Sequence, residues 1–311
     1  MKVGIVGAGM SGLACAEALV RSGHEVALLD KGRGPGGRMS VRRMATPLGE
    51  ASFDHGAQYF TLRDPGFLAR AEDWLARGCI APWPAAGPDA YVGTPGMNAP
   101  IKQMAEAFSV QWSAKVTQLT QQGPGWLIHL EAGDTVEADA VILALPAEQT
   151  AELTASLAPA LSARAQATPA QPCWTVMAAF AERLPTDLDC WRGDEGEAIG
   201  WAARNSSKPG RTGPESWVLQ ASPGWSRQNL EVTQDEVLSI LLGALWERLG
   251  ATATPIAQSA HRWRYARSGA EGSGAIWDSE KRLGLCGDWL IGPRVEAAWL
   301  SGTALAALIK G

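Results

Sequence analysis

Short apolar runs and one amphipathic stretch fill the first thirty residues of the chain. Residues 2–6 are almost wholly apolar, which predicts a buried β-strand. From residue 13 to residue 22 apolar side chains recur at helical spacing, and Gly23 stands where a helix C-cap is expected. A second apolar run covers residues 26–29 and ends at Asp30. The pattern therefore predicts a strand, a helix and a second strand, the opening unit of a parallel α/β sheet.

Apolar periodicity predicts further elements along the chain. The predicted strands are residues 110–119, 126–130, 141–146, 258–267 and 283–286. The helices with the clearest pattern are residues 235–249 and 295–309. The first two of these strands flank turn residues near 121–125, so we expect them to form a small sheet. Residues 205–215 are the richest in turn formers, and the sequence leaves open whether they form a mobile lid or an exposed turn.

A glycine fingerprint lies between the first predicted strand and helix. Gly7 permits a tight turn, Gly9 lets a pyrophosphate approach the backbone, and Gly12 lets the helix lie close to the strand. Asp30, 18 residues beyond Gly12, can accept hydrogen bonds from a ribose and would repel a 2′-phosphate. The residues expected to contact a dinucleotide here are Gly7, Gly9, Met10, Ser11, Gly12 and Asp30. The helix N-terminus adds unpaired N–H groups for the phosphates.

The stretch that follows Asp30 favours FAD over NAD. Two adjacent glycines before Arg38 let the backbone pass close to a diphosphate, and the guanidinium adds a fixed positive charge. Residues 31–40 resemble the second glycine motif of the flavin amine oxidases among the glutathione-reductase-like FAD proteins. The candidate cofactor residues in this stretch are Lys31, Gly37, Arg38 and Met39.

A third FAD marker lies near the other end of the chain. Gly287 and Asp288 follow a predicted strand, and residues 295–302 then open a helix. In FAD proteins of this shape the Asp bonds ribityl or phosphate oxygens, and the helix N-terminus stabilises negative charge on the flavin. The resemblance places Val295, Glu296 and Ala297 at that N-terminus. It also places the backbone near Val116 against the adenine.

Several longer strings are similar to the renalase family, especially its bacterial members. They are residues 53–61 (FDHGAQYFT), 201–205 (WAARN), 207–211 (SKPGR), 225–229 (WSRQN), 260–267 (AHRWRYAR), 286–289 (CGDW), 294–296 (RVE) and 298–302 (AWLSG). This resemblance covers essentially the whole chain. It implies an FAD-dependent oxidase that takes hydride from 1,2- and 1,6-dihydro isomers of NAD(P). The products would be NAD(P)⁺ and, with O2 as the electron acceptor, H2O2.

Two other functions stay open at the level of sequence. A flavin amine oxidase acting on a small amine is the nearest alternative, and such enzymes often use a Lys near the flavin. Lys208 is the only Lys between residues 116 and 280 and lies in the turn-rich loop, which weakens this alternative. A non-catalytic FAD-binding protein is the third possibility. It would contain flavin that no donor reduces.

The resemblance also gives candidate residues for the reaction. Tyr59 and Trp289 are expected to form walls beside the flavin, with Gln58 also at the cofactor. His261 and Tyr265 would share one face of the predicted strand 258–267 and so line one pocket wall. His261 could orient a carboxamide or could be purely structural. A dihydropyridine becomes aromatic when it loses hydride, so positioning matters more here than a strong base.

Weaker expectations concern other polar residues. His55 could lie near the flavin, while Cys286 is expected to be a buried thiol, which predicts non-covalent FAD. The candidates to face substrate phosphates are Arg204, Arg227, Arg262 and Arg264.

Composition limits the partners and the compartment. The net charge is −5, and no basic stripe suggests nucleic acid. The five Cys are widely spaced without a CxxC, which argues against a disulfide framework and against a metal site. No apolar run is long enough for a membrane span, so we expect a cytoplasmic protein.

The expected fold class is α/β, with a glutathione-reductase-like FAD-binding Rossmann domain and a discontinuous α+β substrate domain. The FAD-binding domain would comprise residues 1–72, 94–155 and 276–311. The substrate domain would comprise residues 73–93 and 156–275. The sequence does not decide the preferred isomer, NAD against NADP in the substrate, the physiological acceptor or the oligomeric state.

Overall fold

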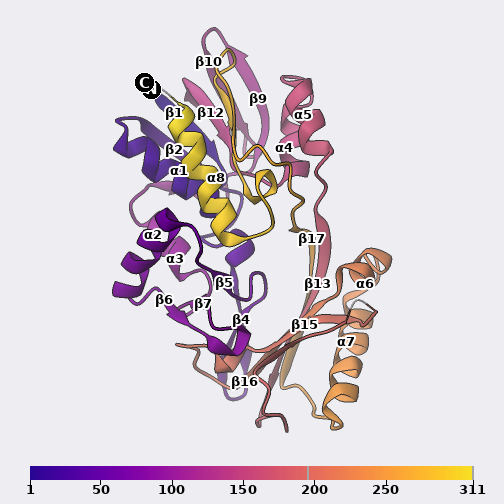
Figure 1. The fold of residues 1–311 in the computed structure, drawn as a ribbon. Coiled ribbons are helices and arrows are strands. Elements are labelled where there is room, and N and C mark those ends of the chain that lie inside the picture. The colour runs from indigo at the N-terminus through magenta and orange to yellow at the C-terminus, as the bar shows by residue number, and fades with distance from the viewer. Residues whose placement is uncertain (195, 310–311) are drawn as a thin grey trace.

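The computed structural model describes residues 1–194 and 196–309. A six-stranded sheet in the order β18–β19–β12–β1–β2–β8 carries the first glycine motif. Figure 1 labels its strands β1, β2 and β12. Its strands are β1 (Lys2–Val6), β2 (Glu25–Leu29), β8 (Val110–Gln111), β12 (Ala140–Leu143), β18 (Ile276–Asp278) and β19 (Leu283–Leu285). Neighbouring strands are parallel except β18 with β19. The predicted opening is confirmed, because α1 (Met10–Arg21) joins β1 to β2.

Side chains of this sheet alternate between two cores. Val3 and Ile5 point toward α1 and α8 (Val295–Leu308), whereas Val6 points to the opposite face. A small antiparallel sheet of β9 (Val116–Gln122), β10 (Gly125–Leu130) and β11 (Thr135–Ala138) packs on that second face. Helices α4 (Ala147–Thr154) and α5 (Pro159–Gln166) extend the same core. The main sheet is therefore covered by helices on one face and by a sheet on the other.

Helix α1 is held between two backbone contacts that only glycine allows. A Cβ on Gly12 would lie 1.9 Å from the carbonyl oxygen of Gly7. A Cβ on Gly302, in α8, would lie 2.1 Å from the carbonyl oxygen of Ser11. The first contact sets α1 against the β1 turn and the second sets α8 against α1, as Figure 1 shows. The predicted packing role of Gly12 is confirmed.

A five-stranded antiparallel sheet forms the second unit, in the order β14–β15–β16–β13–β17. Its strands are β13 (Gln171–Phe180), β14 (Cys190–Arg192), β15 (Ile199–Arg204), β16 (Glu215–Ala221) and β17 (Ala257–Arg267). Helices α6 (Pro223–Gln228) and α7 (Gln234–Leu249) lie against it. The predicted helix 235–249 is confirmed as α7, which begins with a Thr233–Glu236 capping box and ends at the left-handed Gly250.

Short elements join the two sheets. The hairpin β3 (Val41–Thr46) and β4 (Gly49–Asp54) packs through Phe53 onto Met177 and Val218 of the five-stranded sheet. A three-stranded sheet contains β5 (Phe60–Thr61), β6 (Ile80–Pro82) and β7 (Ala90–Gly93). Helices α2 (Pro65–Ala76) and α3 (Ala99–Ala105) flank this region. Helix α2 runs across residue 72, where the predicted FAD-binding domain would pass into the substrate domain.

The predicted strand 110–119 is wrong as a single element. It is divided into β8, which extends the main sheet, and β9, which starts the small sheet. Ser113 between them has a φ of 57°, and its N–H bonds the carbonyl oxygen of Gly32. Ala114 bonds the carbonyl oxygen of Asp30, so the chain turns where it passes the end of β2. Apolar periodicity cannot detect such a turn, because the residues on both sides of it remain strand formers.

Residues 205–215 combine buried side chains with exposed residues, among them Gly210, Thr212 and Gly213. After a short 3-10 helix (Asn205–Ser207), the side chains of Lys208 and Arg211 are buried under β4 and β7. A Cβ on Gly213 would lie 2.6 Å from the carbonyl oxygen of Glu50.

No helix in the described residues is long and apolar enough to cross a membrane.

Candidate active site

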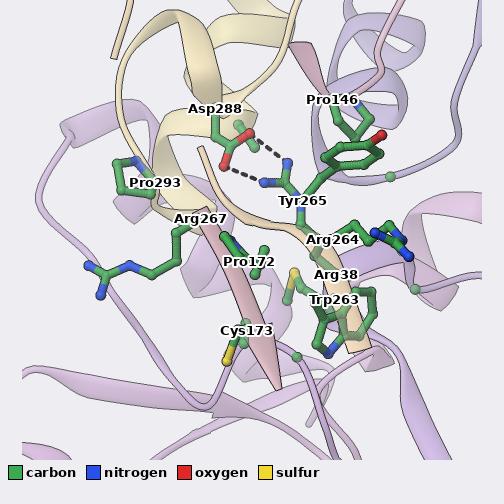
Figure 2. Close-up of a pocket in the computed structure, with 18 of the residues that line it drawn as sticks. Arg38, Pro146, Pro172, Cys173, Trp263, Arg264, Tyr265, Arg267, Asp288 and Pro293 are labelled. Atoms are coloured by element: carbon green, nitrogen blue, oxygen red, sulfur yellow. Dashed lines mark hydrogen bonds and ion pairs between the residues drawn. The ribbon is translucent and has the colours of Figure 1, made fainter. Parts of the chain in front are cut away.

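A cavity of about 1560 Å³ is lined by residues of both units. Its walls come from the β1–α1 turn, the segment after β2, the start of β9, the long strand β17 and the N-terminus of α8. Figure 2 shows Trp263, Arg264 and Tyr265 of β17 along one wall of this cavity. Small-molecule sites usually have volumes of about 300 to 1,000 Å³, so there is room for a large cofactor and a second ligand.

The first glycine motif presents open backbone to this cavity. Gly9 lines it, and a Cβ placed on Gly9 would meet nothing within 4 Å. Asp30 also lines the cavity and accepts hydrogen bonds from the N–H groups of Ala8 (2.7 Å) and Gly32 (2.6 Å). These bonds fix the Asp30 carboxylate beside the turn, where its remaining lone pairs can accept from ribose hydroxyls.

Arg38 and Asp288 are joined across the cavity wall. The guanidinium of Arg38 donates to both carboxylate oxygens of Asp288, at 2.8 and 2.5 Å (Figure 2). The Ser268 hydroxyl donates to the same carboxylate at 2.8 Å. Asp288 is 5% exposed, so the pair is well shielded on the carboxylate side. Two cofactor motifs separated by 250 residues are thereby fixed relative to each other, in a bidentate geometry that resists rotation.

The start of α8 is anchored by Glu296. Its carboxylate accepts from the N–H groups of Arg63 (2.7 Å) and Asp64 (2.8 Å), just before α2 begins. Glu296 and Val295 line the cavity, so the unpaired N–H groups of the first turn of α8 lie at its edge. An electron-rich ring placed there would be stabilised by the helix dipole.

Most of the predicted cofactor residues line the cavity. They are Gly7, Gly9, Met10, Ser11, Asp30, Lys31, Gly37, Arg38, Met39, Gln58, Tyr59, Val116, Asp288, Val295 and Glu296. Three others do not reach it. Gly12 faces the Gly7 carbonyl, Gly287 bonds the Ser301 hydroxyl through its N–H, and Ala297 is fully buried in the protein. Their roles are in packing, which corrects the expectation of direct contact.

The predicted reaction residues also differ in whether they line the cavity. Tyr59, His261 and Tyr265 line the cavity, and His261 and Tyr265 lie four residues apart on β17. Trp289 does not line it. Its side chain is fully buried in the core beneath β12 and β19, and its indole N–H donates to the carbonyl oxygen of Leu145 at 3.2 Å. The expectation that Trp289 forms a wall beside the flavin is therefore corrected.

His55 lies just behind the cavity wall in an aromatic cluster. Its ring centre is 5.1 Å from that of His261 and 5.0 Å from that of Trp263, whose indole N–H donates to the His55 carbonyl oxygen. Burial, and then the nearby His261 and Arg42, lower the pKa of His55 to about 4. Burial and then Arg42 lower the pKa of His261 as well. Both imidazoles are therefore neutral at pH 7 and can orient a ligand without adding charge.

Acid should destabilise the fold through His55. Between its usual pKa of about 6.5 and the folded value near 4, the unfolded chain binds a proton that the folded protein does not. The free energy of unfolding should therefore fall as the pH falls through this window, by up to roughly 3 kcal/mol. Urea denaturation at pH 7, 5.5 and 4.5 measures the effect. In His55→Asn the free energy of unfolding should fall less steeply with decreasing pH. His129→Asn, in the small sheet, is the control and should keep the pH dependence of the wild type. The same pH dependence in all three proteins would contradict this prediction.

The four predicted phosphate-binding arginines have different environments. Arg204 is buried and pairs with Asp189 (2.9 Å) and Glu215 (3.0 Å), and neither it nor Arg227 lines the cavity. Arg262 and Arg264 do line it. Both pair with Glu231, each at 2.7 Å, so part of their charge is already neutralised.

A buried charged cluster behind Gln58 was not predicted. The Lys208 ammonium lies 3.1 Å from Asp54 and 3.2 Å from the Gln58 amide oxygen, and Arg211 lies 2.5 Å from Asp54. Burial lowers the pKa of Lys208 to about 8. Burial would raise the pKa of Asp54, but the charges of Lys208 and Arg211 outweigh it and the pKa is lowered. The cluster fixes the Gln58 carboxamide, and it buries Lys208, which lies in the loop as predicted.

The cavity is cationic although the protein is acidic overall. Nine basic side chains line it: Lys31, Arg38, Arg63, Lys115, Arg192, Arg262, Arg264, Arg267 and Arg294. Five acidic side chains line it: Asp30, Glu152, Glu231, Asp288 and Glu296. The whole chain carries a net charge of −5, so the cavity concentrates the positive charge. Such a lining favours ligands that carry several negative charges. Among the described residues no cluster of three or more His, Cys, Asp or Glu side chains is placed to hold a metal ion.

Comparison with known proteins identifies the family. Residues 5–73 match an NAD(P)-binding Rossmann-like domain, and residues 81–310 match the family described as flavin containing amine oxidoreductase. The chain belongs to this flavin-containing amine oxidoreductase family. It is 26% identical to renalase of Mus musculus over 302 residues, which cover 86% of this chain and 85% of that protein.

Solved structures share the fold. A redesigned putrescine oxidase superposes with a TM-score of 0.72 at 16% identity, covering 98% of each chain. Cyclohexylamine oxidase from Brevibacterium oxydans IH-35A gives a TM-score of 0.72 at 14% identity, covering 99% of this chain and 98% of the other.

The residues present suit FAD as the cofactor. The open Gly9 turn and Arg38 can face the diphosphate, Asp30 can hold a ribose, and the N-terminus of α8 can face the flavin ring. Cys286 is fully buried beside Cys15, as expected for a core thiol. Family and fold together show a renalase-like FAD-dependent oxidoreductase of mixed α/β fold.

Proposed function

We propose that the protein oxidises 1,2- and 1,6-dihydro isomers of NAD(P) to NAD(P)⁺. The net reaction combines the dihydropyridine, O2 and one proton, and it gives NAD(P)⁺ and H2O2. When bound, FAD would accept the hydride and deliver the electrons to O2. The similarity to renalase supports the dihydronicotinamide substrate. We further propose that FAD is bound non-covalently, that its domain has the glutathione-reductase-like form, and that the protein is cytoplasmic.

The observation that carries this proposal is the excess of basic side chains around the cavity. A dinucleotide substrate brings two phosphates into a site that already faces the diphosphate of the cofactor. The nine basic and five acidic side chains that line the cavity can balance that charge. The same positive field would repel a substrate that carries an ammonium group. The size of the cavity, about 1560 Å³, also suits a nucleotide better than a small amine.

The aromatic and imidazole side chains that line the cavity suit a reaction that needs positioning of the substrate and no strong base. Tyr59 and Tyr265 offer aromatic surface, and His261 offers a neutral hydrogen-bonding ring. Aromatisation of the pyridine ring drives hydride loss, so the protein has to hold the ring in one orientation and exclude water. The three side chains can do this without a carboxylate beside the ring.

A small amine is the second candidate substrate. The family name and two structural neighbours refer to amines, and Lys208 is buried next to Gln58 of the cavity wall. Lys208 does not itself line the cavity, and the positive lining opposes an ammonium group. Amines therefore serve as the comparison substrates in the test.

The test is anaerobic mixing of the purified holoenzyme with dihydro-NAD isomers while the flavin band at about 450 nm is followed. We expect rapid bleaching by the 1,2- and 1,6-isomers, slow bleaching by ordinary 1,4-NADH and none by putrescine or cyclohexylamine. Readmission of air should restore the colour and release one H2O2 for each substrate consumed.

Two results would contradict the proposal. Bleaching by an amine, without bleaching by the isomers, would place the protein with the amine oxidases. Flavin that no donor reduces would indicate a non-catalytic FAD-binding protein.

A further inference from the structure

Arg192 lines the same cavity as Tyr59 and His261. It ends the edge strand β14, and its side chain lies over two aromatic rings of the cavity wall. The centre of the guanidinium is 5.8 Å from the Tyr59 ring and 4.9 Å from the Trp201 ring. One N–H also donates to the Tyr59 hydroxyl. Sequence analysis did not single out this residue.

Among residues 1–194 and 196–309 the guanidinium makes one hydrogen bond, to the Tyr59 hydroxyl, and the two rings orient it. An arginine carries five N–H donors in one plane, and stacking uses the face of that plane and none of its edges. The Tyr59 and Trp201 rings are tilted to each other with their centres 5.5 Å apart, and the guanidinium lies over both. A fixed, planar set of donors at the edge of a cavity matches the geometry of a phosphate or carboxylate.

Two other arginines that line the cavity differ from Arg192 in their partners. Arg262 and Arg264 share Glu231 as a counter-ion. No carboxylate in residues 1–194 and 196–309 lies within ion-pair distance of Arg192.

We propose that Arg192 binds the phosphate next to the nicotinamide ribose of the substrate and so selects nucleotides over unphosphorylated ribosides. This inference rests on the proposed function, since it takes the ring that stacks near Tyr59 to be the reacting one. Tyr59 then contributes by orienting the Arg192 guanidinium, through its hydroxyl and its ring. The class of substrate selected is a phosphorylated dihydropyridine riboside.

The experiment measures binding of oxidised, non-reacting probes to the holoenzyme. Nicotinamide mononucleotide and nicotinamide riboside differ only in the phosphate, and each is titrated by its perturbation of the flavin spectrum. In the wild type we expect the mononucleotide to bind about tenfold more tightly, because a charge-assisted hydrogen bond to the exposed Arg192 would contribute that difference. Raising the ionic strength should reduce this preference.

Three variants locate the effect. In Arg192→Met the two probes should bind equally, while riboside binding stays within about twofold of wild type, because only the phosphate contact is lost. Arg192→Lys should keep part of the preference, since it retains the charge without the planar fork. Arg227→Met is the matched control. It removes another arginine, outside the cavity, and should change neither value.

The outcomes separate this inference from the proposed function. A mononucleotide preference that persists in Arg192→Met would place the phosphate elsewhere and overturn the inference, as would equal binding of both probes to the wild type. If the dihydro isomers fail to bleach the flavin but Arg192→Met still removes the binding preference, the proposed function fails and the phosphate site stands. Thermal unfolding of each variant verifies that it is folded.

Discussion

Asp288→Asn is expected to yield a protein that purifies nearly colourless. The substitution keeps the shape of the side chain but removes the negative charge that holds Arg38 by two hydrogen bonds, at 2.8 and 2.5 Å. Arg38 is one-third exposed, so it can turn toward water, and the second glycine segment then loses its fixed cation. We expect a loss of FAD affinity of at least 100-fold, which corresponds to about 3 kcal/mol.

The measurement for Asp288→Asn is the ratio of bound FAD to protein after purification, followed by titration of the apoprotein with FAD. Asp278→Asn provides the matched control. It changes a carboxylate of β18 that accepts from the Lys281 N–H outside the cavity, so FAD content should remain normal. Wild-type FAD affinity in Asp288→Asn would show that the Arg38 pair serves packing alone.

Gly12→Ala should prevent folding, whereas Gly9→Ala should preserve the fold and weaken FAD binding. The added Cβ at residue 12 would lie 1.9 Å from the Gly7 carbonyl oxygen, a backbone atom that cannot move without displacing the β1 turn. The cost should exceed about 4 kcal/mol, a large share of the stability of a typical domain. At residue 9 the added methyl group meets nothing in the protein and enters only the space over the turn.

Soluble yield and thermal unfolding check the glycine prediction, and FAD titration distinguishes the two variants. Gly243→Ala, in α7, is the control, because a Cβ there meets nothing within 4 Å and alanine is the better helix former. It should raise the free energy of unfolding by about 0.5 to 1 kcal/mol. A soluble, stable Gly12→Ala protein would mean that α1 can move away from β1.

The sequence predicted those features that depend on local backbone geometry. The glycine turn after β1, Asp30 at the end of β2 and the start of α8 at Val295 each follow from a few adjacent residues. The helix α7 was predicted with equal success because the spacing of its buried apolar residues is a local pattern. Motifs of this kind carry their own structural context, so they can be recognised without the tertiary fold.

Side-chain direction and long-range pairing could not be predicted in the same way. Trp289 directly follows the cofactor residue Asp288, but the 3-10 turn after Gly287 directs its ring into the core. Lys208 lies among turn formers, yet the fold buries it beside Asp54, a residue 154 positions earlier. Arg192 had no local signal, because its two aromatic neighbours come from other strands or loops.

The Arg38–Asp288 pair also has a consequence for biosynthesis. One half of the cofactor site is translated within the first 40 residues, and the other half, with Asp288 and α8, is translated about 250 residues later. A nascent chain that has not reached α8 has the glycine turn but lacks the carboxylate and the helix that complete the site. Ribosomes stalled before residue 288 should therefore carry chains that do not retain FAD, and cofactor capture should follow translation of the last helix.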